Sequence, residues 1–256
     1  MKVTVVQLPE DQSVFEQAMA DLADHVRAEK SQFLLLPEMP FSSWMAYEKT
    51  VDPEVWAAAV DTHTEWISRL GSFGVDLIVG SKPVLQEGHA HNDAFILSND
   101  SEQFLHRKYY LPNEGGFWEA TWYERASSPD FNSVKSAENV VVGAMICSDI
   151  WFGEHARSYA RQGVHLLVNP RATGSGSLEK WLAGGQAAAV MSGAYCLSSN
   201  RYGPGQGFDW GGMGWIIDPD GEVLARTSAE QPFVTMDLDL SVAEKAKSSY
   251  PRDVRE

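Results

Sequence analysis

The sequence predicts an α/β layer protein in which short strands alternate with amphipathic helices. Short runs of β-branched and other apolar residues recur along the chain, separated by longer stretches whose apolar residues follow the 3.6-residue period of a helix. No Pro- or Ser-rich linker, repeat or low-complexity stretch interrupts this alternation. We therefore expect a single domain over residues 1–256.

The amino-terminal half begins with an apolar strand and a helix over residues 13–30. In that helix an apolar residue returns at every fourth position, at Val14, Ala18, Leu22 and Val26. A second helix is predicted over residues 53–70, because Asp52 suits its N-cap and Pro53 its first turn. The predicted strands of this half cover residues 3–8, 33–36, 77–80, 94–97 and 103–109.

The carboxyl-terminal half continues the alternation and then changes character. Strands are predicted over residues 139–146, 165–169 and 194–199, and helices over 152–161 and 178–192. A β-hairpin region follows, with strands at 215–217, 223–225 and 233–237 around the turn at 218–221, ahead of a final short helix. The irregular stretches 111–135 and 200–214 are long loops, which are expected to carry a binding site.

The composition excludes several classes of protein. With 20 Lys+Arg against 35 Asp+Glu the net charge is −15, and no basic stripe offsets it, so neither a nucleic acid nor an anionic membrane is an expected partner. No apolar run approaches a membrane span, and the first residues lack a secretory signal. Cys147 and Cys196 cannot form a disulfide framework, and His89 and His91 lack a third metal ligand. These features predict a cytoplasmic protein without a metal site.

Three chemically useful side chains stand where predicted strands end. Glu38 follows an apolar strand directly, Lys108 closes another, and Cys147 lies where a buried strand gives way to a helix. Sheets of α/β proteins build their sites at the carboxyl ends of strands. Taken singly, each residue also has an ordinary explanation: a small buried thiol, a loop carboxylate and a solvated lysine at a strand end.

The segments around these residues resemble the carbon–nitrogen hydrolases of the nitrilase superfamily. The matching blocks occur in the family's order, and the similarity continues into SGAYCLSSNR and GGMGWIIDPDGEVL, so that it covers nearly the whole chain. The blocks are LLLPEMPFSSW, HRKYYLPNEGGFWEATWYERA and GAMICSDIWFGEHARSYARQGVHLLVNP. The resemblance implies a four-layer αββα sandwich that needs no metal or organic cofactor. It also implies that copies of the chain pair into a homodimer or a larger homo-oligomer.

The resemblance also implies a role for each site residue. Cys147 would be the nucleophile that forms a thioester, Glu38 the general base, and Lys108 the cation that stabilises the oxyanion together with the backbone N–H of Ser148. Glu119, in the segment GGFWE, matches a further glutamate that many members place beside the lysine.

The expected substrate is a small linear amide or N-carbamoyl compound. Nitrilases commonly carry Trp-Glu after the nucleophile, whereas this chain has Ser148-Asp149-Ile150, which favours amides over nitriles. Nitrile hydrolysis, acyl transfer to an amine by the same residues, and a catalytically silent assembly subunit remain alternatives.

Several further residues are candidates for binding the substrate. Trp122 and Trp151, with Trp118 and Tyr123, lie in the blocks that should line the site, although aromatic residues are also ordinary core material. Arg171, in NPRAT, follows the strand after the nucleophile helix. Its guanidinium would suit a substrate carboxylate, the alternative being a surface or dimer-contact arginine.

Overall fold

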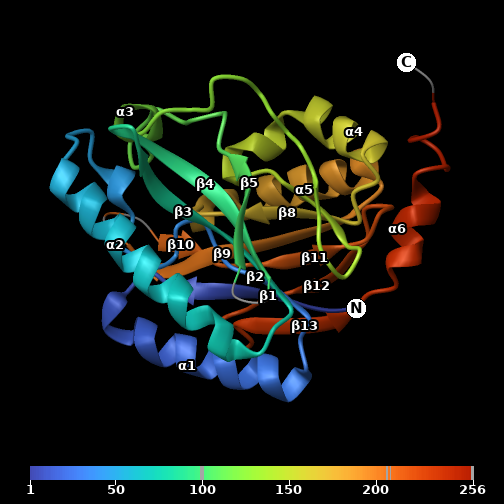
Figure 1. Ribbon diagram of the computed structural model, residues 1–256, viewed down its shortest axis with the longest axis horizontal. Helices are drawn as coiled ribbons and strands as arrows, with labels where there is room; N and C mark the ends of the chain where they lie inside the picture. Colours follow the sequence, from blue (N-terminus) through green and yellow to red (C-terminus); the bar gives the residue numbers. More distant parts are fainter. Residues whose placement is uncertain (99–100, 206, 208, 255–256) are drawn as a thin grey trace.

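A sheet of parallel and antiparallel strands organises the amino-terminal half of the computed structural model (Figure 1), which describes residues 1–98, 101–205, 207 and 209–254. Its parallel centre consists of β1, β2 and β3, extended by antiparallel β4 and β5 on one side and by β13 on the other. The strands are β1 (Lys2–Pro9), β2 (Phe33–Leu35), β3 (Leu77–Gln86), β4 (His89–Ser98), β5 (Ser101–Arg107) and β13 (Phe233–Asp237).

The carboxyl-terminal half forms a second group of strands, joined to the first by the pairing of β1 with β9. The order across both groups is β5-β4-β3-β2-β1-β9-β8-β7-β6, with β10 and β11 also paired to β9 and β12 paired to β11. The strands of this group are β6 (Val134–Lys135), β7 (Val141–Ala144), β8 (Leu166–Pro170), β9 (Tyr195–Pro204), β10 (Asp209–Gly211), β11 (Trp215–Ile217) and β12 (Val223–Arg226).

Helices cover the outer faces of the two groups. The longer ones are α1 (Gln12–Glu29), α2 (Pro53–Leu70), α4 (Gly153–Arg161) and α5 (Leu178–Ser192), with α6 (Leu240–Ala246) near the carboxyl terminus. The short elements are the helix α3 (Glu119–Trp122) and the 3-10 turns η1 (Met45–Tyr47), η2 (Gly71–Phe73), η3 (Cys147–Trp151) and η4 (Ser175–Ser177).

The two-residue period of the strands sorts their side chains between separate cores. In β1, Val3 and Val5 enter a core shared by both groups of strands, whereas Val6 and Leu8 pack with residues of α1 and α2. In β8, Leu166 and Val168 enter the shared core, while Leu167 packs with residues of α4 and α5. The layers therefore run helix, sheet, sheet, helix, which confirms the predicted αββα sandwich.

Most predicted elements begin and end within a few residues of the observed ones. Two of the helices that agree closely, α1 and α2, begin at a side-chain N-cap. Asp11 accepts a hydrogen bond from the backbone N–H of Ser13 at the start of α1, and Asp52 accepts one from Glu54 at the start of α2. The prediction for residues 200–214 is wrong in part: the end of β9 and all of β10 lie there, apart from residues 206 and 208, which are outside the described part. Likewise α3 and β6 lie within the predicted loop 111–135.

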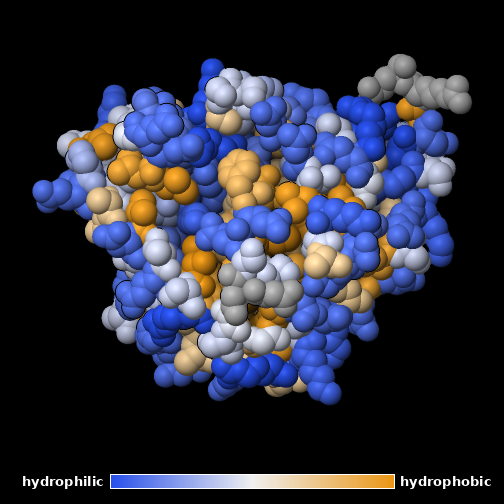
Figure 2. All heavy atoms as spheres, in the orientation of Figure 1, coloured by the Kyte–Doolittle hydropathy of each residue, from blue (hydrophilic) through white to orange (hydrophobic). Residues whose placement is uncertain are grey.

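One face of the molecule is mainly polar. Figure 2 shows hydrophilic side chains over most of one face, with hydrophobic patches between them. Within the described ranges, no helix combines the length and the apolar composition that crossing a membrane requires.

Candidate active site

Cys147 is the first residue of η3, at a sharp turn that follows β7. Its φ is +46°, in the left-handed region that non-glycine residues seldom adopt, so this backbone conformation must be held by neighbouring contacts. Asp149 provides one such contact, since Oδ2 accepts from the N–H of Ile146 at 3.1 Å. Asn169, at the end of β8, provides another by donating from Nδ2 to the carbonyl of Cys147 at 3.1 Å.

Asp149 also ties this turn to the segment that follows β5. Its Oδ1 accepts a hydrogen bond from the N–H of Tyr110 at 2.9 Å, and its Oδ2 lies 2.9 Å from Nε2 of His106. The Asp149 side chain is completely buried. The nucleophile turn and the Lys108 segment are therefore held together by one carboxylate.

Glu38 lies in the loop after β2, and its backbone is anchored on both sides. Its N–H donates to the carbonyl of Arg171 at 3.2 Å, and its carbonyl accepts from Nε of Arg201 at 3.2 Å. Arg201 is itself buried and pairs with Glu10. The carboxylate of Glu38 is thereby aimed inward, where Asn92 of β4 donates from Nδ2 to Oε1 at 2.8 Å.

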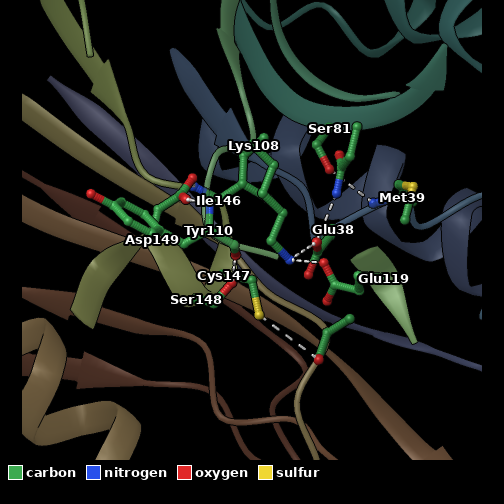
Figure 3. A network of polar contacts seen from close by, with 12 residues as sticks. Glu38, Met39, Ser81, Lys108, Tyr110, Glu119, Ile146, Cys147, Ser148 and Asp149 are labelled. Carbon is green, nitrogen blue, oxygen red and sulfur yellow. Dashed lines mark hydrogen bonds and ion pairs between the residues drawn. The ribbon is translucent and has the colours of Figure 1, made fainter. Parts of the chain in front are cut away.

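Lys108 connects the two glutamates. Its Nζ lies 2.7 Å from Oε1 of Glu38 and 2.5 Å from Oε2 of Glu119, and all three side chains are completely buried. The hydroxyl of Tyr123 donates to the same Oε2 of Glu119. Figure 3 shows the Lys108 side chain pointing at both carboxylates, with the Cys147 sulfur beside them.

Burial and neighbouring charges shift the pKa values of Cys147, Lys108 and Glu119. Burial, reinforced by Glu38, holds the pKa of the Cys147 thiol well above its ordinary value. Burial alone would lower the pKa of Lys108, but Glu119 and Glu38 outweigh it, so the pKa is raised and the ammonium keeps its charge. Burial raises the pKa of Glu119 to about 7, against the opposing effect of Lys108. The resting state therefore pairs a neutral thiol with a permanent cation.

Two carboxylate oxygens at this site have no partner among the described residues. They are Oε2 of Glu38 and Oε1 of Glu119, both buried. Unsatisfied buried oxygens are uncommon because each costs desolvation free energy. The Oε2 atom of Glu38 is thus free to accept a proton, since its neighbour Oε1 is occupied by Lys108 and Asn92.

A cavity of about 290 Å³ leads to Cys147. Glu119, Ser148 and Trp151 contribute to its wall, together with residues of the 112–117 segment and of the η4 region. Its size suits a small molecule. Cys147 opens η3, and the first N–H groups of a helical turn have no partner inside that turn, which leaves the N–H of Ser148 free to donate.

Comparison with known proteins identifies this arrangement. The sequence profile described as "Carbon-nitrogen hydrolase" matches residues 2–248, nearly the whole chain. The chain belongs to the carbon–nitrogen hydrolase family. It is 30% identical over 234 residues to "Omega-amidase NIT2" of Xenopus tropicalis, a match covering 86% of this chain and 81% of that protein.

Two further comparisons extend the family assignment. The chain is 28% identical over 235 residues to "Omega-amidase, chloroplastic" of Arabidopsis thaliana, covering 86% of this chain but spanning only 62% of that longer protein. The crystal structure of a carbon–nitrogen hydrolase from Helicobacter pylori superposes with a TM-score of 0.86 at 20% identity, covering 98% of this chain and 94% of that one. That likeness shows that the family's fold is present here.

Within this carbon–nitrogen hydrolase, the structure brings most of the predicted site residues together. Glu38, Lys108 and Glu119 form one hydrogen-bonded cluster beside Cys147, and the wall of the cavity includes Ser148 and Trp151. Trp151 is 47% exposed, so its ring is accessible from the cavity entrance.

Two predicted substrate-binding residues lie elsewhere. Trp122 is buried against a different cluster, donates from Nε1 to the carbonyl of Glu48 at 2.6 Å, and borders a separate hollow. Arg171 is completely buried, and its three nitrogens donate to Ser198, Thr173 and the carbonyl of Met213. Neither Trp122 nor Arg171 is part of the wall of the cavity beside Cys147, and their binding of substrate stays a prediction.

Other residues of the site were not singled out from the sequence as site residues. Asn92, Asn169 and Arg201 position the glutamate and the nucleophile turn, and Asp149 links that turn to Lys108. Asn169 carried a usable signal, since it ends a predicted strand next to a proline, at the edge where sites form. No comparable signal marks Asn92, which lies within β4.

Proposed function

We propose that this chain is an amidase that hydrolyses a small linear amide or N-carbamoyl compound through a thioester on Cys147. The observation that carries the proposal is a buried ammonium, Lys108, held between Glu38 and Glu119 beside a thiol on a strained turn. The names of the Arabidopsis and Xenopus relatives, both omega-amidases, support amides as the substrate class.

Acylation begins from the protonated thiol. Oε2 of Glu38 accepts the Sγ proton as sulfur attacks the carbonyl carbon, so a thiolate need not accumulate against the raised pKa of Cys147. Lys108 donates hydrogen bonds from two of its three ammonium N–H groups to carboxylates, which leaves the third N–H for the developing oxyanion. The N–H of Ser148 supplies a second donor, and losing one such donor typically costs about 3 kcal/mol of barrier.

The tetrahedral intermediate then collapses. Glu38 returns its proton to the substrate nitrogen, the C–N bond breaks, and ammonia or an amine leaves the acyl group on Cys147 as a thioester. Water attacks the thioester carbon while Glu38 takes a water proton, and that proton passes to sulfur as the C–S bond breaks. The products are a carboxylic acid and the regenerated thiol.

Glu119 and Tyr123 act through Lys108 in this scheme. Glu119 holds the ammonium together with Glu38, and the Tyr123 hydroxyl orients the Glu119 carboxylate. We assign both as positioning residues, because neither is required to exchange a proton with the substrate.

Release of ammonia from a panel of small primary amides and N-carbamoyl amines tests the proposal. The wild-type chain should release ammonia from at least one member, and Cys147→Ala should lose at least about 1,000-fold in kcat/KM. Cys196→Ala is the matched control, because Cys196 is also buried but packs in a separate core. Equal rates for wild type and Cys147→Ala would reject the proposal.

Assembly and location are part of the proposal as well. The family resemblance supports a homodimer or larger homo-oligomer, which analytical ultracentrifugation would test. The two unpaired cysteines support a cytoplasmic enzyme. The family resemblance supports action without a metal or organic cofactor.

A further inference from the structure

The cavity beside Cys147 has an unusual balance of charge. Its ionisable lining consists of Glu114, Glu119 and Cys147, and no Lys, Arg or His is found among the described residues of its wall. Lys108 lies behind the wall, where two carboxylates already contact its single positive charge. Arg171, the nearby cation expected to bind a carboxylate, is buried among protein partners. An anionic acyl group would therefore enter this cavity without a counter-charge.

Glu114 is held at this wall by a tight turn. Its backbone N–H donates to the carbonyl of Phe117 at 3.2 Å, and its own carbonyl accepts from the Phe117 N–H at 2.9 Å. Between them Gly116 has a φ of +83°, and its carbonyl accepts from Nε1 of Trp44 at 3.0 Å. The Glu114 side chain is exposed. Among the described residues, none donates a hydrogen bond to its carboxylate or forms an ion pair with it.

Aromatic rings complete the same wall. Phe117, Trp151 and Trp181 all line the cavity, and the rings of Trp151 and Trp181 lie 4.8 Å apart between centroids. Trp151 packs closely over Gly184 of α5, where an added Cβ would come within 2.9 Å of the ring. Aromatic faces attract cations, and a free carboxylate beside them adds a direct counter-charge.

We infer that the acyl part of the substrate carries a cation, an ammonium or guanidinium group, that binds Glu114 among these rings. This inference rests on the proposed amidase function and names its substrate class. In the competing arrangement the acyl group carries an anion, and its charged end extends out of the cavity to Arg125. Arg125 lies over the ring of Tyr109 in a neighbouring open groove of about 860 Å³, which shares Ser148 and Trp151 with the cavity.

Binding of three primary amides of matched length separates these arrangements. The probes are 5-aminopentanamide, hexanamide and 4-carbamoylbutanoate, which end in an ammonium, a methyl group and a carboxylate. Calorimetry on the Cys147→Ala variant measures their Kd values without turnover, while ammonia release by the wild type measures hydrolysis separately. If the wild type hydrolyses none of the amides, the proposed function fails. The order of the three Kd values tests the inference about the cation separately.

The ammonium amide should bind about fivefold more tightly than hexanamide, the scale of an exposed ion pair, and the carboxylate amide should bind most weakly. In the Cys147→Ala background, Glu114→Gln should make the Kd values of 5-aminopentanamide and hexanamide nearly equal. Glu114→Lys should make 4-carbamoylbutanoate the tightest-binding of the three amides. Glu124→Gln is the matched control, since it removes an exposed carboxylate outside the cavity, and it should preserve the wild-type ratio.

Three results would overturn the inference. The first is equal or undetectable binding of all three amides. The second is an ammonium preference that survives Glu114→Gln. The third is tightest binding of the carboxylate amide together with loss of that preference in Arg125→Gln, which would place the acyl terminus in the neighbouring groove.

Discussion

Asn92 donates a hydrogen bond from Nδ2 to Oε1 of Glu38 over 2.8 Å. The same oxygen lies 2.7 Å from Nζ of Lys108, so two donors occupy Oε1 while Oε2 stays free. The pairing therefore decides which oxygen of the carboxylate can act as the base. It also fixes the carboxylate plane, which a single ion pair to Lys108 would leave free to rotate.

Replacing Asn92 with Ala should lower kcat by about tenfold to a hundredfold, because a hydrogen bond to a charged group is worth about 1.5–3 kcal/mol. KM should change much less, since Asn92 is not part of the cavity wall. Steady-state kinetics on the best amide measures both. Asn132→Ala, at an exposed position outside the cavity wall, is the control. A wild-type kcat in a folded Asn92→Ala protein would show that Glu38 needs no such partner.

Tyr123 should influence the acid limb of the pH profile of kcat/KM through its hydrogen bond to Glu119. Burial raises the pKa of Glu119 to about 7. The hydrogen bond from Tyr123 opposes this rise, because it stabilises the ionised carboxylate. A proton on Glu119 weakens its hold on Lys108, so kcat/KM should fall as the pH drops below about 7. In Tyr123→Phe the pKa of Glu119 rises, and the limb should move to higher pH.

Profiles of kcat/KM between about pH 5 and 9 measure this shift. Glu119→Gln serves as the reference, because its acid limb should lose the inflection altogether. An unchanged limb in Tyr123→Phe, or one displaced to lower pH, would contradict the assignment of Tyr123 and Glu119.

His63 should make the fold sensitive to acid. It is completely buried in α2, where Nε2 accepts from the N–H of Phe41 and Nδ1 contacts the carbonyl of Ala59. Burial lowers its pKa from 6.5 to about 3. The unfolded chain therefore binds this proton first. The contribution of neutral His63 to the free energy of unfolding is fully present above pH 6.5. It falls as the pH drops towards 3, by up to about 1.4 kcal/mol per pH unit.

Urea denaturation of the wild type and His63→Leu at several pH values across this range isolates the effect. The variant should show a shallower loss of unfolding free energy with acid, whatever its stability at neutral pH. Identical slopes for the two proteins would mean that His63 does not contribute.

Gly143 should be required for packing α4 against the sheet. A Cβ at this position of β7 would come within 2.8 Å of the ring of Tyr159, which is completely buried. Gly143→Ala should lower the free energy of unfolding by about 1–3 kcal/mol. Gly176→Ala is the comparison, because a Cβ there meets nothing within 4 Å. If both variants unfold at the same denaturant concentration as the wild type, the contact is not limiting.

The sequence predicts the elements well and their edges less well. The helix period and the caps at Asp11 and Asp52 locate α1 and α2 closely. The apolar run 139–146 reads as one strand, yet β7 ends at Ala144. It ends because the N–H of Ile146 bonds to the side chain of Asp149 rather than continuing the ladder, and no local pattern encodes that contact.

The site is predictable only in part for a similar reason. Position at a strand end marks Glu38, Lys108 and Cys147 as candidates, while their grouping into one site came from the family resemblance. The direction of a side chain just past a strand cannot be read from periodicity. Arg171 follows β8 by one residue, and its inward direction is decided by Ser198 of β9, which lies far along the chain.

Intact-mass spectrometry of enzyme quenched during turnover of a primary amide tests the central claim most directly. The account predicts a covalent adduct equal in mass to the acyl group minus one hydrogen, located on Cys147 by peptide mapping. It should be absent from Cys147→Ala and form much more slowly in Glu38→Gln, because Glu38 accepts the thiol proton during acylation. Sustained ammonia release by Cys147→Ala at the wild-type rate, with no adduct on any residue, would contradict a thioester mechanism.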